Sequence, residues 1–138
     1  MESTKTSKLM IQYSDLIGLP YTREHDCNWL AAEVFSRFGQ EFPEIVTPKD
    51  SSEWEGLFTK SITEYFESTP HIRPCTMLTF CFPEGERLGW HIGVMIDDDK
   101  MITTTARMGV HLIHRNPKNA YESIWWAYYR GSYRLKHD

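Results

Sequence analysis

A cysteine between two polar residues, at the start of a predicted helix, is the residue of this chain best suited to nucleophilic chemistry. Cys27 follows Asp26, and from Asn28 to Phe38 apolar residues recur at helical spacing. Asp26 is therefore predicted to cap a helix whose first residue is Cys27. There, the helix dipole and unpaired backbone N–H groups would lower the thiol pKa and stabilise an oxyanion formed by attack on a carbonyl. The alternative is an inert, buried thiol that falls near a helix start.

A nucleophilic cysteine needs a base, and His91 is the histidine with the most suitable predicted position. It opens a predicted strand over residues 91–96, so its side chain is expected to project from a rigid element at the rim of a sheet. His25 and His71 lie in predicted loops, and His137 lies in the terminal tail. Taken singly, a histidine at a strand start is better explained as an exposed polar residue.

Helices are predicted in the first half of the chain and strands in the second. Amphipathic spacing predicts helices over residues 10–17, 28–38 and 50–66. Short segments rich in β-branched and aromatic residues predict strands over residues 76–82, 91–96, 100–106, 109–114, 123–130 and 131–136. This order indicates one α+β domain over residues 1–138, with N-terminal helices packed on a C-terminal antiparallel sheet.

Composition excludes several classes of function. The chain has 138 residues and a net charge of −4, which argues against a dedicated nucleic-acid-binding protein. Its polar start is unlike a secretion signal, and no run of about 18 apolar residues predicts a membrane span. The 3 cysteines are an odd number, so at least one thiol is expected to be free.

The spacing of the other cysteines does not predict a metal site. Cys75 and Cys81 are six positions apart, and no pair of histidines at short spacing completes a zinc ligand set. They are expected to be small core residues. No metal and no cofactor is therefore expected.

The order of the motifs resembles that of the NlpC/P60 cysteine peptidases, which have a papain-like fold. Gly-Leu-Pro-Tyr at residues 18–21, Asp-Cys at 26–27, His-Ile-Gly-Val at 91–94 and Gly-Val at 109–110 are similar to the family's helix start and sheet. The likeness covers residues 8–114, and the short interval before Asp-Cys is most similar to a compact, phage-associated branch. The chain differs where the family has Asp-Cys-Ser-Gly, because Asn28 and Trp29 follow the cysteine.

The resemblance implies a role for each matching residue. Cys27 would be the nucleophile and His91 the base, and Tyr21 would lie beside the nucleophile. The family places a third polar residue one hairpin after the histidine. If residues 97–99 form the hairpin loop, Thr103 pairs with the glycine two residues after His91 and shares its sheet face. His111, one strand further, is the alternative.

The resemblance also implies a function. Such an enzyme would cleave amide bonds in peptidoglycan stem peptides, typically after D-γ-glutamate. It would act as a component of a phage tail or baseplate, with other tail proteins as partners, and the virion would deliver it without a secretion signal. The alternatives are a structural tail protein that keeps the fold without catalysis, and a toxin-type amidase or acyltransferase. The unusual third residue favours the structural alternative.

Overall fold

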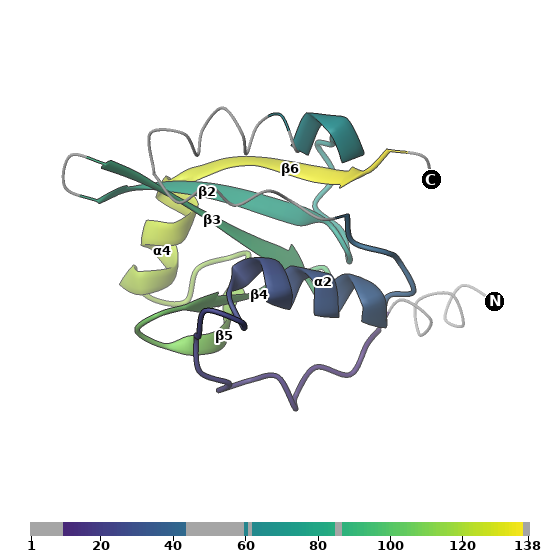
Figure 1. The fold of residues 1–138 in the computed structure, drawn as a ribbon. Helices are drawn as coiled ribbons and strands as arrows, with labels where there is room; N and C mark the ends of the chain where they lie inside the picture. The colour runs from purple at the N-terminus through teal and green to yellow at the C-terminus, as the bar shows by residue number, and fades with distance from the viewer. Residues whose placement is uncertain (1–9, 44–59, 61, 85–86, 137–138) are drawn as a thin grey trace.

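An antiparallel sheet with a helix on each face forms most of the described part of the protein (Figure 1). The structure is a computed structural model that describes residues 10–43, 60, 62–84 and 87–136. Neighbouring strands are antiparallel throughout, in the order β1-β6-β2-β3-β4-β5. Their bounds are Phe66–Ser68 (β1), Met77–Glu84 (β2), Arg87–Met95 (β3), Lys100–Thr105 (β4), Gly109–His114 (β5) and Tyr129–Leu135 (β6). The α+β class predicted from the sequence is confirmed.

Helix α2 (Cys27–Arg37) begins and ends where its sequence predicts. The Asp26 side chain accepts a hydrogen bond from the N–H of Trp29 at 2.9 Å, which makes it the N-cap. Gly39 has a φ of 79°, and the N–H of Gln40 bonds the carbonyl of Phe35 at 2.9 Å. This left-handed residue with a bond back into the last turn is a Schellman motif, which closes the helix and satisfies its terminal carbonyls.

The buried face of α2 packs on one face of the sheet. Leu30, Ala31, Val34 and Phe35 are buried, and α2 contacts β3 and β4. These helix residues form an apolar cluster with residues of the sheet that include Ile92, Val94, Ile102 and Val110. Since side chains alternate along a strand, the residues between these belong to the opposite face.

Helix α4 (Ala120–Ala127) lies on that opposite face and corrects one prediction. Residues 123–130 were expected to form a strand, but most of them are helical, and β6 begins only at Tyr129. Asn119 caps the helix by accepting from the N–H of Glu122 at 2.9 Å. Trp125 anchors α4 in a second apolar cluster, together with Leu78, Phe80, Met95, Met101 and Ile113 of the sheet.

The helix predicted over residues 10–17 does not form. Residues 14–18 form turns, and the chain then runs along the edge of β5. The N–H of Gly18 bonds the carbonyl of Val110, and the N–H of Val110 bonds the carbonyl of Leu19, both at 2.9 Å. Leu16 is the buried residue of this segment, while Ile17 is 42% exposed.

The third predicted helix can be followed only at its end. Residues 50–59 lie outside the described residues, whereas residues 62–65 are helical and Phe66 already belongs to β1. Among the helices that the structure describes, none has the length and apolar character needed to cross a membrane.

Candidate active site

Strands β3 and β4 pair over a short ladder next to their hairpin. The paired residues are Val94 with Ile102 and Met95 with Met101. The N–H of Met95 bonds a carbonyl just before β2 at 2.9 Å, so the even-numbered residues of β3 direct their backbone groups toward β4. Ile92 therefore faces β4 beyond the end of the ladder, where other groups must satisfy its N–H and C=O.

Cys27 and Thr103 are the hydrogen-bond partners of these two backbone groups of Ile92. The N–H of Ile92 is directed at the Cys27 sulfur. The Thr103 hydroxyl donates to the carbonyl of Ile92 at 2.9 Å. The N-terminus of α2 thus fits the place where β3 and β4 separate, and the sulfur lies against the backbone next to His91.

The surroundings of Cys27 raise its pKa instead of lowering it. The residue is partly buried, and desolvation of the sulfur is the largest influence. The Asp26 carboxylate raises the pKa further, and the N–H groups of Ile92, Cys27 and Asn28 oppose both effects. The result is a thiol with a pKa of about 11. The expected lowering of the pKa is therefore wrong, and the sulfur is protonated at neutral pH.

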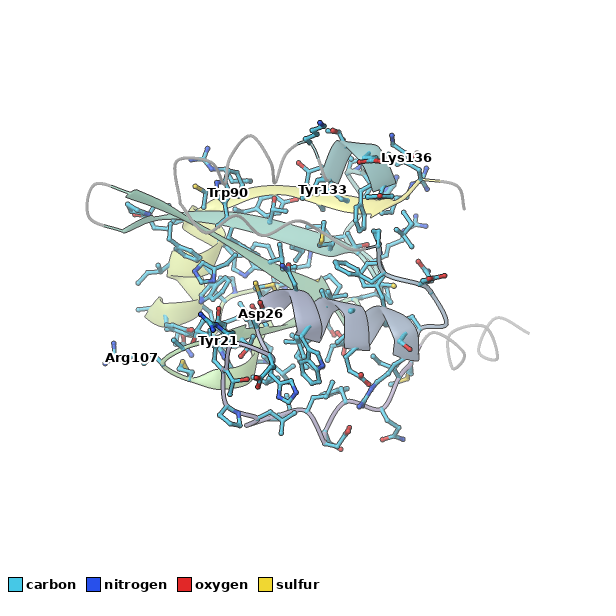
Figure 2. All side chains as sticks on the ribbon, viewed as in Figure 1. Tyr21, Asp26, Trp90, Arg107, Tyr133 and Lys136 are labelled. Carbon is cyan, nitrogen blue, oxygen red and sulfur yellow. The ribbon has the colours of Figure 1, made fainter. Side chains whose placement is uncertain are left out.

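Tyr21 lies close to Cys27 and Asp26. Figure 2 shows Tyr21 and Asp26 together at the N-terminal end of α2. Burial raises the pKa of the Tyr21 phenol, and the charges of Cys27 and Asp26 raise it further. At neutral pH the phenol therefore keeps its proton and can donate it in a hydrogen bond.

His91 lies in the middle of β3, not at a strand start. Its neighbour across the β2–β3 ladder is Phe80, and its ring contacts Phe82 and Trp125 at centroid distances of 5.3 and 5.9 Å. These residues belong to the α4 face, whereas Cys27 packs with the α2 face. The His91 ring therefore lies on the α4 face of the sheet, whereas the Cys27 sulfur lies on the α2 face.

Thr103 and His111 lie opposite each other on β4 and β5, on the same face as His91. The hairpin loop falls at residues 97–99, as expected, since the N–H of Ile96 bonds the carbonyl of Lys100 at 3.0 Å. Thr103 is fully buried, and its proton is used on the backbone. It could serve an imidazole only as a hydrogen-bond acceptor.

The ring of His111 is held by two other groups. Its Nδ1 lies 2.8 Å from the carbonyl of Gly109, and its Nε2 lies 2.9 Å from the Tyr121 hydroxyl. His25, close in sequence to Cys27, packs against Trp29 at 4.2 Å between ring centroids. His111 therefore lies on the face of His91 but is oriented by α4.

Glu122 has a structural role that its sequence pattern was not taken to predict. This buried carboxylate accepts from the N–H of Lys118 at 2.7 Å and lies 2.8 Å from Nδ1 of His114. The signal was present as Asn119-x-x-Glu122, which is typical of a helix start. The contacts of Glu122 hold α4 against the end of β5, and thereby place Trp125 beside His91.

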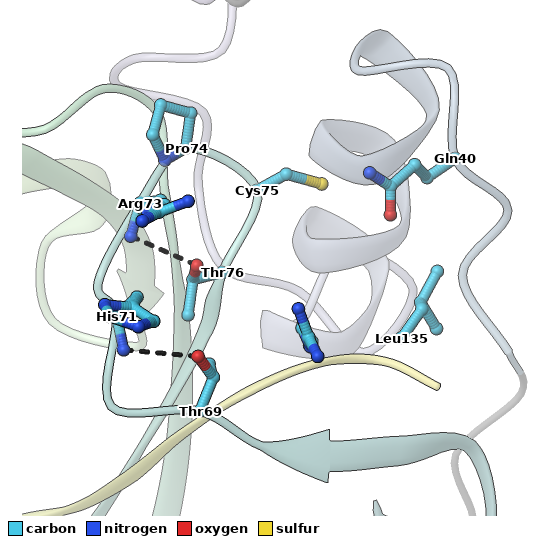
Figure 3. Close-up of a pocket in the computed structure, with 9 residues that line it drawn as sticks. Gln40, Thr69, His71, Arg73, Pro74, Cys75, Thr76 and Leu135 are labelled. Carbon is cyan, nitrogen blue, oxygen red and sulfur yellow. Dashed lines mark hydrogen bonds between the residues drawn. The ribbon is translucent and has the colours of Figure 1, made fainter. Parts of the chain in front are cut away.

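A separate cavity of about 180 Å³ lies before β2 (Figure 3). Cys75 has a φ of 67°, and its side chain points across this cavity toward Gln40. His71 and Arg73 line the same cavity. Cys75 and Cys81 are both buried, as expected. Within the described ranges, no cluster of His, Cys, Asp or Glu side chains is suited to hold a metal ion.

Comparison of the chain with protein-family models and with curated proteins gives no match. The likeness to NlpC/P60 peptidases therefore depends on the motifs in residues 18–21, 26–27, 91–94 and 109–110.

Proposed function

We propose that the protein is a cysteine hydrolase with a papain-like NlpC/P60 fold that cleaves amide bonds in peptidoglycan stem peptides. The observation that carries this proposal is the position of Cys27. It is the first residue of α2, and the N–H of Ile92, the residue after His91, is directed at its sulfur. A nucleophile, hydrogen-bond donors for an oxyanion and a nearby imidazole are the parts that acyl transfer needs.

The raised pKa of Cys27 assigns a definite task to His91. Because the sulfur is protonated at neutral pH, His91 takes its proton as the sulfur attacks the amide carbon. The imidazole then gives this proton to the leaving nitrogen, and a thioester remains. Water, deprotonated by the same imidazole, attacks the thioester and releases the carboxylate and the thiol. This mechanism requires the His91 ring to reach the sulfur beyond the end of the β3–β4 ladder, which stops at Val94 and Ile102.

Other residues would assist this reaction. Tyr21 donates its phenolic proton toward the oxyanion or a substrate carbonyl. Thr103, as an acceptor, or His111 would orient the His91 ring. The likeness to the phage-associated branch extends the proposal to a tail or baseplate component, made in the bacterial cytoplasm and carried by the virion with other tail proteins.

A second candidate is a structural tail protein that keeps the fold without catalysis. Two observations favour it: the pKa of Cys27 is raised to about 11, and the Thr103 hydroxyl donates to the backbone. Both would be expected if selection for a reactive thiol had been lost.

The deciding experiment measures new amino groups released from purified peptidoglycan. We expect release by the wild type and none by Cys27→Ala or His91→Gln. Cys81→Ala is the matched control, because it removes a buried thiol on β2 and should keep activity. Melting temperatures of all variants show whether each one folds.

Two results would contradict the hydrolase. One is unchanged release by a folded Cys27→Ala protein. The other is no release by the wild type, even when assembled with its natural partners, while assemblies with Cys27→Ala function normally. The second result would establish the structural candidate.

A further inference from the structure

A groove of about 340 Å³ lies between α4 and the turn that joins β4 to β5. Phe82, His91 and Trp125 line it, and their rings contact one another at centroid distances of 4.9 to 5.9 Å. Neither Cys27 nor Tyr21 lines it, so this groove is distinct from the surroundings of the sulfur. It reaches the proposed base from the other face of the sheet.

The walls of this groove are apolar and exposed to water. Ile124 is 52% exposed, Met108 51% and Tyr121 38%. Large apolar side chains that are exposed one by one are ordinary on a protein surface, but these three line one concavity with Phe82 and Trp125. A bound apolar group would remove all of them from water together.

Arg107 supplies a positive charge at the rim of the groove. It lines the groove, and Figure 2 shows its side chain extending away from the protein. Within the part of the chain that the structure describes, no acidic side chain forms an ion pair with Arg107. An apolar ligand that also carries an anionic group would therefore be complementary to both features.

We propose that this groove binds a bulky apolar side chain of a peptide whose neighbouring carboxylate pairs with Arg107. The volume, about 340 Å³, is near the lower end of the roughly 300–1,000 Å³ of small-molecule sites, which suits one or two side chains better than a long acyl chain. The proposal goes beyond the proposed function, because His91 lines the groove but Cys27 does not. The binding itself does not depend on catalysis.

The test uses the full chain with Cys27→Ala, so that nothing is turned over. Four probes are titrated: N-acetylphenylalanine, N-acetylphenylalaninamide, N-acetylalanine and decanoate. The side-chain methyl signals of Ile124 and Met108, followed by NMR, report occupancy. We expect N-acetylphenylalanine to shift them saturably and to bind about two- to fivefold more tightly than its amide, as an exposed ion pair contributes. N-acetylalanine should bind more weakly than either.

Matched variants separate the two parts of the proposal. Arg107→Gln should remove the difference between the acid and its amide, whereas Arg130→Gln, another exposed arginine, should keep it. Ile124→Ser should weaken all apolar probes. Ile17→Ser, which removes an exposed isoleucine outside the groove, should not.

Three results would overturn the proposal. They are the absence of a saturable shift up to the solubility limit of N-acetylphenylalanine, equal binding of N-acetylalanine, and tighter binding of decanoate than of every peptide probe. None of these bears on amide cleavage by Cys27. Conversely, inactivity on peptidoglycan with intact binding would contradict the proposed function alone and support the binding site.

Discussion

At the scale of single residues, Asp26 has two opposing effects. Its side chain caps α2 and so makes Cys27 the first residue of the helix. The same carboxylate raises the pKa of the adjacent thiol, in addition to the larger effect of desolvation. The helix start alone would lower the thiol pKa, as the sequence predicted, but burial and the neighbouring negative charge outweigh it and raise the pKa.

Alkylation of Cys27 by iodoacetamide tests this. We expect the rate to rise with pH toward about 11, so that Cys27 reacts more slowly at neutral pH than a free thiol of pKa 9.0. Asp26→Asn should speed the reaction at a given pH, because asparagine also caps helices but carries no charge. Mass mapping at several pH values separates Cys27 from Cys75 and Cys81. Rapid labelling of Cys27 well below pH 8 would contradict the raised pKa and favour a resting thiolate.

At the scale of elements, a few polar contacts decide that residues 120–127 form a helix. The run Ile124 to Tyr128 is aromatic and β-branched, which favoured a strand. Just before this run, the Asn119 side chain accepts a hydrogen bond from the N–H of Glu122, and the Glu122 carboxylate accepts from the N–H groups of Lys118 and His114. These contacts satisfy N–H groups at the helix start, which have no partner within the helix. Once α4 has formed, its Trp125 side chain covers the sheet face that carries His91.

Replacing Glu122 tests how much these contacts stabilise the protein. Burial raises the pKa of this carboxyl, but hydrogen bonds from His114 and from the N–H of Lys118 outweigh that effect, so the pKa is lowered overall. Its contribution to stability is therefore present above the unfolded value of 4.5 and is lost as the pH falls through the lower folded value. Glu122→Gln should reduce the free energy of unfolding at pH 7 by about 1–3 kcal/mol.

Denaturant titrations at neutral and acid pH measure this effect. The difference between wild type and Glu122→Gln should shrink at acid pH, where the wild-type carboxylate is also neutralised. Glu67→Gln is the control, because Glu67 is only partly buried and pairs with the exposed Arg134, which should contribute less than about 1 kcal/mol. Equal losses of unfolding free energy for both variants at pH 7 would show that the buried contacts of Glu122 stabilise the protein no more than the surface pair of Glu67 and Arg134.

At the scale of the whole molecule, the segment before Tyr21 joins α2 to the β5 edge of the sheet. Arg37 at the end of α2 pairs with Asp15 at 2.6 Å, and Gly18 and Leu19 bond β5. The segment thus spans from α2 to β5 and continues directly into Tyr21 (Figure 1). The surroundings of the sulfur therefore depend on contacts at both ends of this segment.

Gly109→Ala should break the contact with β5. Gly109 has a φ of 70°, and an added Cβ would lie 2.5 Å from the carbonyl oxygen of Leu19. Gly39→Ala is the matched control, since its φ of 79° gives similar strain but the new methyl meets nothing within 4 Å. Left-handed strain costs about 1–2 kcal/mol in both, and the clash should add about 1–3 kcal/mol at Gly109 alone.

Hydrogen exchange and melting temperature measure the outcome. Gly109→Ala should melt below Gly39→Ala, and the amide of Val110, which bonds Leu19, should lose protection only in Gly109→Ala. Equal melting temperatures with unchanged protection would show that the segment adapts to the added methyl group without cost.

Local sequence determined the features whose causes lie within a few residues. Asp26 and Gly39 set the start and end of α2, and the loop at residues 97–99 set the hairpin of β3 and β4. The strands β2 to β5 followed from β-branched and aromatic runs between turns. Helix α4 also had a local signal at Asn119, but the aromatic composition of the run concealed it.

Tertiary structure alone decided the features that depend on distant partners. Gly18 and Leu19 bond β5 instead of continuing a helix, because β5 offers an edge with unpaired backbone groups. The separation of β3 from β4 placed Cys27 at Ile92, and desolvation there raised the thiol pKa. Spacing along a chain fixes which face a side chain takes, but burial and neighbouring charge depend on what packs against it, and these packing partners come from far along the sequence.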